Sequence, residues 1–231
     1  MGKPSLEEIK KEMLEKTKNW DFIKALPDKI DAFSKKLDGT IAGNILTICT
    51  YSALTINAKV DIIYTFETSD YILIRTMGLN TYRDISYIFR EKDLFAAKVT
   101  ANLPQILHQM EHPEDVNLGE MVADQHILTW QYGNSLPPKI GSFQLYIKPS
   151  HAIEHLNGSI ILIDYTDFAK NDQLVIYYNR LRNDFYGEAR IAGVFHATKQ
   201  YDATNLTQLQ EKLEKNLNNT LEKIATASHE I

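Results

Sequence analysis

The second half of the chain holds several short runs of β-forming residues, and the connections between them are too short for a helix. These runs cover residues 140–148, 159–165, 173–179 and 186–197. Parallel strands need a crossover of about a dozen residues or more, usually a helix, to bring the chain back to the same end of the sheet. We therefore expect these strands to pair antiparallel.

The first half contains a similar signal. Residues 60–66 and 71–77 are rich in Ile and Tyr, and the polar residues 67–70 lie between them, so the pattern predicts a hairpin. The uncharged stretch 39–58 is ambiguous. Its β-branched residues favour a strand, whereas its length without a clear turn favours a buried helix.

Helical patterns lie at both ends and in the middle of the chain. Ser5 and Glu8 form a capping-box pattern that begins an N-terminal helix. Pro27 suits the first position of a second helix, and the spacing of Ile30, Phe33 and Leu37 predicts that this helix ends at 38–39, so that segment 5–37 is helical. Further helices are predicted from about residue 93, with a break or kink at a proline, at 118–128, and at about 204–225.

Together these patterns predict an α+β fold: an antiparallel β-sheet with helices packed on it, a helical N-terminus and a long amphipathic C-terminal helix. We expect residues 1–231 to form a single domain, because the one plausible internal boundary is the loop near 133–139. The sequence shows no evident internal repeat.

Composition limits the class of protein. Apolar residues make up 44% of the chain and charged residues 24%, values typical of a globular protein with a sizeable core. Cys49 is the only cysteine, which excludes an internal disulfide and fits a reducing, cytoplasmic location. A net charge of −5 argues against a nucleic-acid partner, and polar residues within 39–58 argue against a membrane span. We expect Arg180, Arg182 and Arg190 to pair with nearby acidic residues across a hairpin.

Two segments share the pattern H-x-x-E-H, and they are the strongest chemical signal in the sequence. The first runs from His108 to His112 and contains Glu111; the second runs from His151 to His155 and contains Glu154. On a helix, residues four apart lie on one face, so each histidine pair could bind one divalent metal such as zinc. The glutamate beside each pair could act as the general base on a metal-bound water.

A purely structural role explains the same residues. The first pair precedes Pro113, so it falls in the last turn of a helix, where a protonated histidine stabilises the negative end of the helix dipole. The second pair lies in a helix of under two turns predicted between Ser150 and Asn157. No phosphate-binding loop, dinucleotide-binding glycine motif or nucleophile elbow is present.

Three functions follow as hypotheses. The first is a non-catalytic domain that binds a small molecule or a partner and forms a homo-oligomer, with its many tyrosines in a pocket or an interface. The second is a divalent-metal hydrolase that uses one or both H-x-x-E-H segments. The third is a self-assembling protein that associates through its terminal helices, 5–37 and 206–224.

Overall fold

A computed structural model describes residues 5–227 of the chain. They fall into two compact units that divide between Glu111 and His112. This division lies well before the loop near 133–139, which is inside the second unit. Whether the chain behaves as one domain stays a prediction. Within the part of the chain that the structure describes, no helix is both long and apolar enough to cross a membrane.

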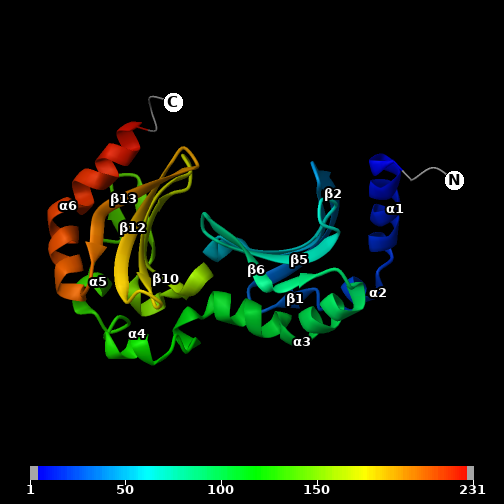
Figure 1. The fold of residues 1–231 in the computed structure, drawn as a ribbon, viewed down its shortest axis with the longest axis horizontal. Coiled ribbons are helices and arrows are strands. Elements are labelled where there is room, and N and C mark those ends of the chain that lie inside the picture. Colours follow the sequence, from blue (N-terminus) through cyan, green and yellow to red (C-terminus); the bar gives the residue numbers. More distant parts are fainter. Residues whose placement is uncertain (1–4, 228–231) are drawn as a thin grey trace. The chain divides into compact units, whose positions relative to one another are not determined.

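Unit 1 is a six-stranded antiparallel sheet with helices before and after it (Figure 1). The strands pair in the order of the sequence, from β1 to β6. Its helices are α1 (Leu6–Lys18), α2 (Asp21–Ala25) and α3 (Lys92–Glu111), with a 3-10 turn, η1, at Leu54–Ile56. Its strands are β1 (Lys29–Ile30), β2 (Phe33–Ala42), β3 (Ile45–Ala53), β4 (Ala58–Thr65), β5 (Asp70–Met77) and β6 (Asn80–Phe89).

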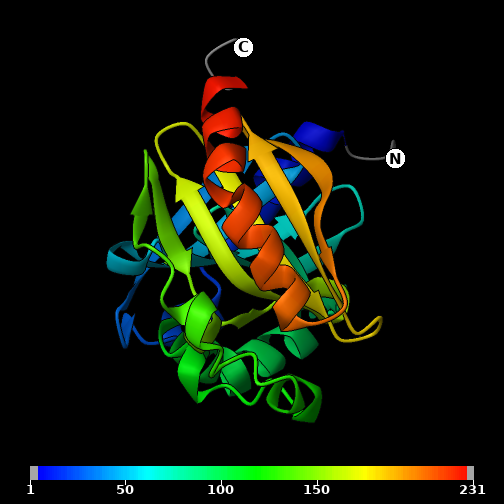
Figure 2. The same cartoon turned by 90° about the vertical axis from the view of Figure 1, so that its left-hand side faces the viewer.

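Unit 2 is again an antiparallel sheet followed by a long helix. Figure 2 shows α6, in orange to red, lying across the strands of its own sheet. The order across the sheet is β7-β8-β10-β11-β12-β13, and β9 pairs with β10. The helices are α4 (Glu120–Asp124), α5 (Gln131–Asn134) and α6 (Leu206–Ala227), with 3-10 turns η2 (Pro113–Asp115), η3 (Pro149–His151) and η4 (Leu156–Gly158). The strands are β7 (Lys139–Ile140), β8 (Phe143–Ile147), β9 (Ile153–Glu154), β10 (Ser159–Asp167), β11 (Asp172–Asn179), β12 (Asp184–Ile191) and β13 (Val194–Ala203).

The predicted α+β class is confirmed: both sheets are antiparallel, a helix opens the described chain and a long helix closes it. The capping box of α1 forms as expected, because the Ser5 side chain accepts from the Glu8 N–H while Glu8 accepts from the Ser5 N–H. The hairpin predicted at 60–66 and 71–77 is β4 and β5.

The helix predicted over 27–38 is wrong. The chain reverses at Asp31, whose φ is +50°, and continues as β2 rather than as a helix. Phe33 and Leu37 share the spacing of a helix face, but β2 pairs with β1 on one side and with β3 on the other. Tertiary hydrogen bonding therefore outweighs the local helical pattern.

Other boundaries differ from those predicted. The ambiguous stretch 39–58 is mostly strand. The single strand predicted at 186–197 is two strands, because the chain turns at Ala192 and Gly193, both with positive φ. The helix predicted at 118–128 shortens to α4, and the one predicted between Ser150 and Asn157 is a 3-10 turn followed by a two-residue strand.

The expectation of no internal repeat is also wrong, because the two units are copies of one architecture. A pattern W-x5-L-P-x-K-I-x-x-F begins at Trp20 and again at Trp130, 110 positions later. From β3 onwards, the strands β3 to β6 begin 114 positions before β10 to β13, and α3 begins 114 positions before α6.

Strand register and turn geometry repeat with the sequence. Tyr51 pairs with Val60 as Tyr165 pairs with Leu174. The irregularity between residues 47 and 49 of β3 recurs between 161 and 163 of β10. Residues in the left-handed region also recur at matching turns: Asp31 and Gly141, Asn57 and Asn171, and Ser69 and Asn183.

The long helices bury the same positions. The buried residues of α3 are Phe95, Val99, Leu103, Ile106, Leu107 and Met110. Those of α6 are Leu209, Leu213, Leu217, Thr220, Leu221 and Ile224, each 114 positions later. Each helix therefore presents an equivalent apolar stripe, and in unit 2 this stripe packs into the core of the sheet.

Candidate functional site

The first H-x-x-E-H segment lies at the end of α3, and its polar groups contact the turn between β1 and β2. The Nδ1 atom of His108 lies 3.2 Å from a carboxylate oxygen of Asp31. Glu111 accepts a hydrogen bond of 2.7 Å from the backbone N–H of Ala32. In this geometry His108 and Glu111 tie the C-terminal turn of α3 to the sheet of unit 1.

The second segment does not form the predicted helix, so its histidines do not share a helical face. His151 ends a 3-10 turn, and Glu154 belongs to the short strand β9. Glu154 forms an ion pair with Arg180. The His155 ring lies 5.8 Å from that of Tyr177, and burial lowers the pKa of His155.

The two H-x-x-E-H segments do not occupy matching places in the two units. Equivalent residues of the two units are 110 positions apart up to β8 and 114 positions apart from β10 onwards. Unit 2 is therefore four residues longer between these strands, and His151–His155 lies in this longer stretch. The positions of α6 that match His108–His112 are 222–226, which contain no histidine.

One histidine from each segment contacts the same carboxylate. The Nδ1 atom of His112 lies 3.5 Å from one oxygen of Glu114, and the Nε2 atom of His151 lies 4.0 Å from the other. A hydrogen bond from its own backbone N–H, followed by the two histidines, lowers the pKa of Glu114. Among residues 5–227, however, no three His, Cys, Asp or Glu side chains are arranged to hold a metal ion. Metal binding by His108, His112, His151 and His155 stays a prediction.

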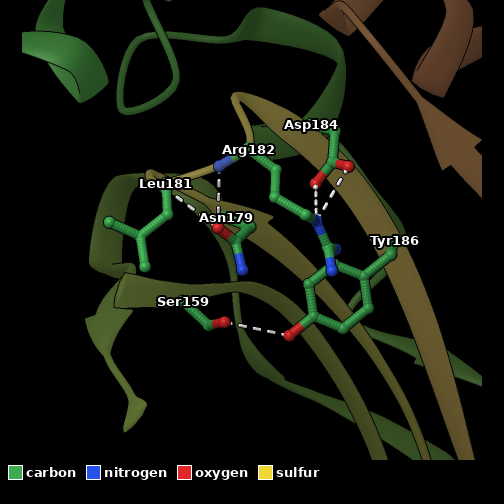
Figure 3. Close-up of polar contacts among 6 residues, drawn as sticks. All are labelled: Ser159, Asn179, Leu181, Arg182, Asp184 and Tyr186. Atoms are coloured by element: carbon green, nitrogen blue, oxygen red, sulfur yellow. Dashed lines mark hydrogen bonds and ion pairs between the residues drawn. The ribbon is translucent and has the colours of Figure 1, made fainter. Parts of the chain in front are cut away.

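Of the three arginines predicted to pair across a hairpin, Arg182 pairs with an acidic residue of the β11–β12 hairpin (Figure 3). The partner of Arg180 is Glu154 of β9, and the Arg190 guanidinium lies 4.2 Å from the centre of the Phe195 ring. Arg182 donates to both oxygens of Asp184, at 3.1 and 3.0 Å, and its guanidinium lies 5.1 Å from the centre of the Tyr186 ring. The Tyr186 hydroxyl is 2.9 Å from that of Ser159. These contacts fix the tip of the hairpin.

Cys49 is fully buried in β3, and burial raises the pKa of its thiol to about 12. A thiol that stays protonated is a poor nucleophile. Cys49 is therefore a core residue.

An accessible chamber with an aromatic lining lies in unit 1, where α1, α2, β5 and the start of α3 meet. Its volume is about 540 Å³. The ring of Trp20 lies 5.0 Å from that of Phe22 and 5.3 Å from that of Tyr71. The polar groups of the chamber come from Lys16, Thr17, Asn19, Asp21, Lys92 and Asp93.

A second chamber of about 430 Å³ lies between α2 and α3 and is almost entirely apolar. Phe22 and Ala96 line both chambers, so the two adjoin at these residues. The remaining lining residues are Ala25, Leu26, Pro27, Ile30, Ala97, Thr100, Leu103 and Pro104. We call the two chambers together the α2–α3 groove.

Small residues on α3 leave the α2–α3 groove open. The positions of α6 that match Ala96, Ala97 and Thr100 carry Gln210, Glu211 and Glu214. Gln210 donates a hydrogen bond of 2.8 Å to Glu214. Burial, and then the nearby Glu214 carboxylate, raises the pKa of Tyr132, the residue that matches Phe22. In unit 2, longer polar side chains therefore stand at these positions, and those of Glu211 and Glu214 are exposed.

The α2–α3 groove was not predicted from the sequence, because only an alignment of the two halves of the chain reveals it. The pattern that begins at Trp20 and Trp130 is visible in the sequence, and it fixes the alignment up to β2 and β8. The exchange of Ala96 and Ala97 for Gln210 and Glu211 could then have indicated a difference in function between the copies.

Comparison with protein families, with curated protein sequences and with solved structures finds no match to this chain.

Proposed function

We propose that this protein is a non-catalytic binding protein and that its α2–α3 groove holds a small, largely apolar organic molecule. The observation that carries this proposal is the difference between the two copies. Beside α3 the small residues Ala96, Ala97 and Thr100 line an apolar chamber, whereas the matching positions of α6 carry the longer polar residues Gln210, Glu211 and Glu214.

The groove has the size and chemistry of a ligand site. Its chambers, of about 540 and 430 Å³, each lie within the range of pockets for small organic ligands. Trp20, Phe22 and Tyr71 supply aromatic surface, and the polar and charged residues stand at one end, in the aromatic chamber. Such a site gains affinity mainly by removing apolar ligand surface from water.

A neutral fluorescent probe, N-phenyl-naphthylamine, tests this proposal. We expect it to bind with a stoichiometry of one per chain and to change the fluorescence of Trp20, measured in a Trp130→Phe variant. Ala97→Glu should weaken binding about tenfold or more, because a charge placed in the apolar chamber must lose its hydration when the probe enters.

Ala101→Glu is the matched control. It makes the same change on an exposed position of α3 that does not line the groove, so its affinity for the probe should equal that of the unmodified protein. The proposal fails if the probe does not bind, or if Ala97→Glu and Ala101→Glu bind it equally well while both keep the circular dichroism spectrum of the parent.

A further inference from the structure

We infer that the ligand of the α2–α3 groove is an amphipathic monoanion, with its anionic group beside Lys92 and its apolar body between α2 and α3. This inference rests on the proposed function and adds the charge and the orientation of the ligand. It follows from the unequal distribution of polar groups along the groove.

Lys92 provides the positioned positive charge. Its Nζ atom lies 5.8 Å from the centre of the Trp20 ring, which is buried and lines the aromatic chamber. The attraction between an ammonium group and an aromatic face holds the cation above the place where a ligand would rest on Trp20. An anionic group bound there would contact Lys92 directly.

Two carboxylates, those of Asp21 and Asp93, line the same chamber, and Asp93 is the one that pairs with Lys92. The Asp93 side chain is 93% exposed, and its carboxylate lies 3.6 Å from Nζ of Lys92. An ion pair in water contributes little free energy, so a ligand anion can replace Asp93 as the partner of Lys92. Lys16 lines the same chamber and adds a second positive charge, although its Nζ atom also contacts Glu12 at 2.7 Å.

The apolar chamber determines where the rest of the ligand lies. Its lining carries no charged side chain, and Thr100 is its only polar residue. An anionic group there would lose hydration without a compensating partner, whereas an apolar body would gain from burial. Since Phe22 and Ala96 line both chambers, one molecule can extend from Lys92 past these two residues into the apolar chamber.

A matched pair of probes separates charge from apolar contact. N-phenyl-naphthylamine is neutral, and anilinonaphthalenesulfonate has the same rings with one sulfonate group. We expect the anionic probe to bind about fivefold more tightly than the neutral one at low salt, and Lys92→Met to remove this difference while leaving the affinity for the neutral probe unchanged. Ala96→Gln should weaken both, because it narrows the junction of the chambers.

Lys98→Met is the control, because Lys98 stands on the same helix with its Nζ atom 5.7 Å from the centre of the Tyr87 ring but does not line the groove. It should leave both affinities unchanged. If both probes bind equally and Lys92→Met changes neither, the inference on charge is overturned while the proposed function stands. If Lys92→Met and Lys98→Met lower the affinity for the anionic probe equally, the inference is overturned, because the general surface charge is then responsible. If neither probe binds, both proposals fall.

Discussion

One tyrosine in each unit closes the same loop. The Tyr51 hydroxyl donates a hydrogen bond of 2.5 Å to the carbonyl of Pro27, and the Tyr165 hydroxyl donates one of 2.6 Å to that of Pro137. Both tyrosines are fully buried, and both prolines belong to the repeated Leu-Pro sequence. This bond fixes the segment that leads from the short helix into the first strand, which in unit 1 also lines the α2–α3 groove.

Tyr165→Phe should lower the free energy of unfolding at neutral pH by about 1 kcal/mol, since the Pro137 carbonyl loses its donor. Burial raises the pKa of Tyr165 to about 12, above the usual value of 10.0. A raised pKa in the folded state means that the stability contributed by this group is present below pH 10.0 and is lost as the pH rises toward 12. Between neutral pH and about pH 11, the free energy of unfolding measured by urea titration should therefore fall less for Tyr165→Phe than for the parent. Equal decreases in the two proteins would contradict this assignment.

At the scale of elements, α3 and α6 bury matching positions but differ in the residues beside the short helix. Their buried positions correspond one to one, so both pack on their sheets with the same face. The flank beside the short helix differs: Ala96, Ala97 and Thr100 on α3 correspond to Gln210, Glu211 and Glu214 on α6. Because this flank lies outside the buried stripe, it can change without loss of the core.

Replacing these three residues of α6 by those of α3 should therefore create a second groove in unit 2. We expect the triple variant Gln210→Ala, Glu211→Ala and Glu214→Thr to open an apolar groove beside Tyr132 and to raise the number of bound neutral probe molecules from one to two per chain. Fluorescence titration at high protein concentration measures this number. A stoichiometry that remains at one would mean that these three side chains do not determine the groove.

At the scale of the whole molecule, each unit has its own sheet, its own long helix and one tryptophan at an equivalent position. Trp20 and Trp130 each form the N-cap of the short helix and each donate a backbone hydrogen bond to the residue three positions earlier. The two tryptophans therefore report separately on the two units.

Core substitutions can show whether the units unfold independently. Leu217→Ala in α6 removes a buried side chain and should cost about 2–5 kcal/mol. We expect it to shift the urea transition seen by Trp130, in a Trp20→Phe background, more than the transition seen by Trp20 in a Trp130→Phe background. Leu103→Ala, at the matching position of α3, should have the reverse effect. Equal shifts at both tryptophans would support the single domain that the sequence predicts.

The amino-acid sequence determined the local elements whose patterns are self-contained. The capping box of α1, the β4–β5 hairpin, the antiparallel strands of the second half and the stripe of α6 follow from spacing and from short connections.

Tertiary structure decided the rest. The segment after Pro27 has the spacing of a helix but becomes a strand because β2 pairs with β1 and β3, and the histidine segment at 151–155 is not helical because it lies in an added stretch between paired strands. The α2–α3 groove depends on the distance between two helices and on small side chains between them, so no local pattern marks it, although the comparison of the two copies does.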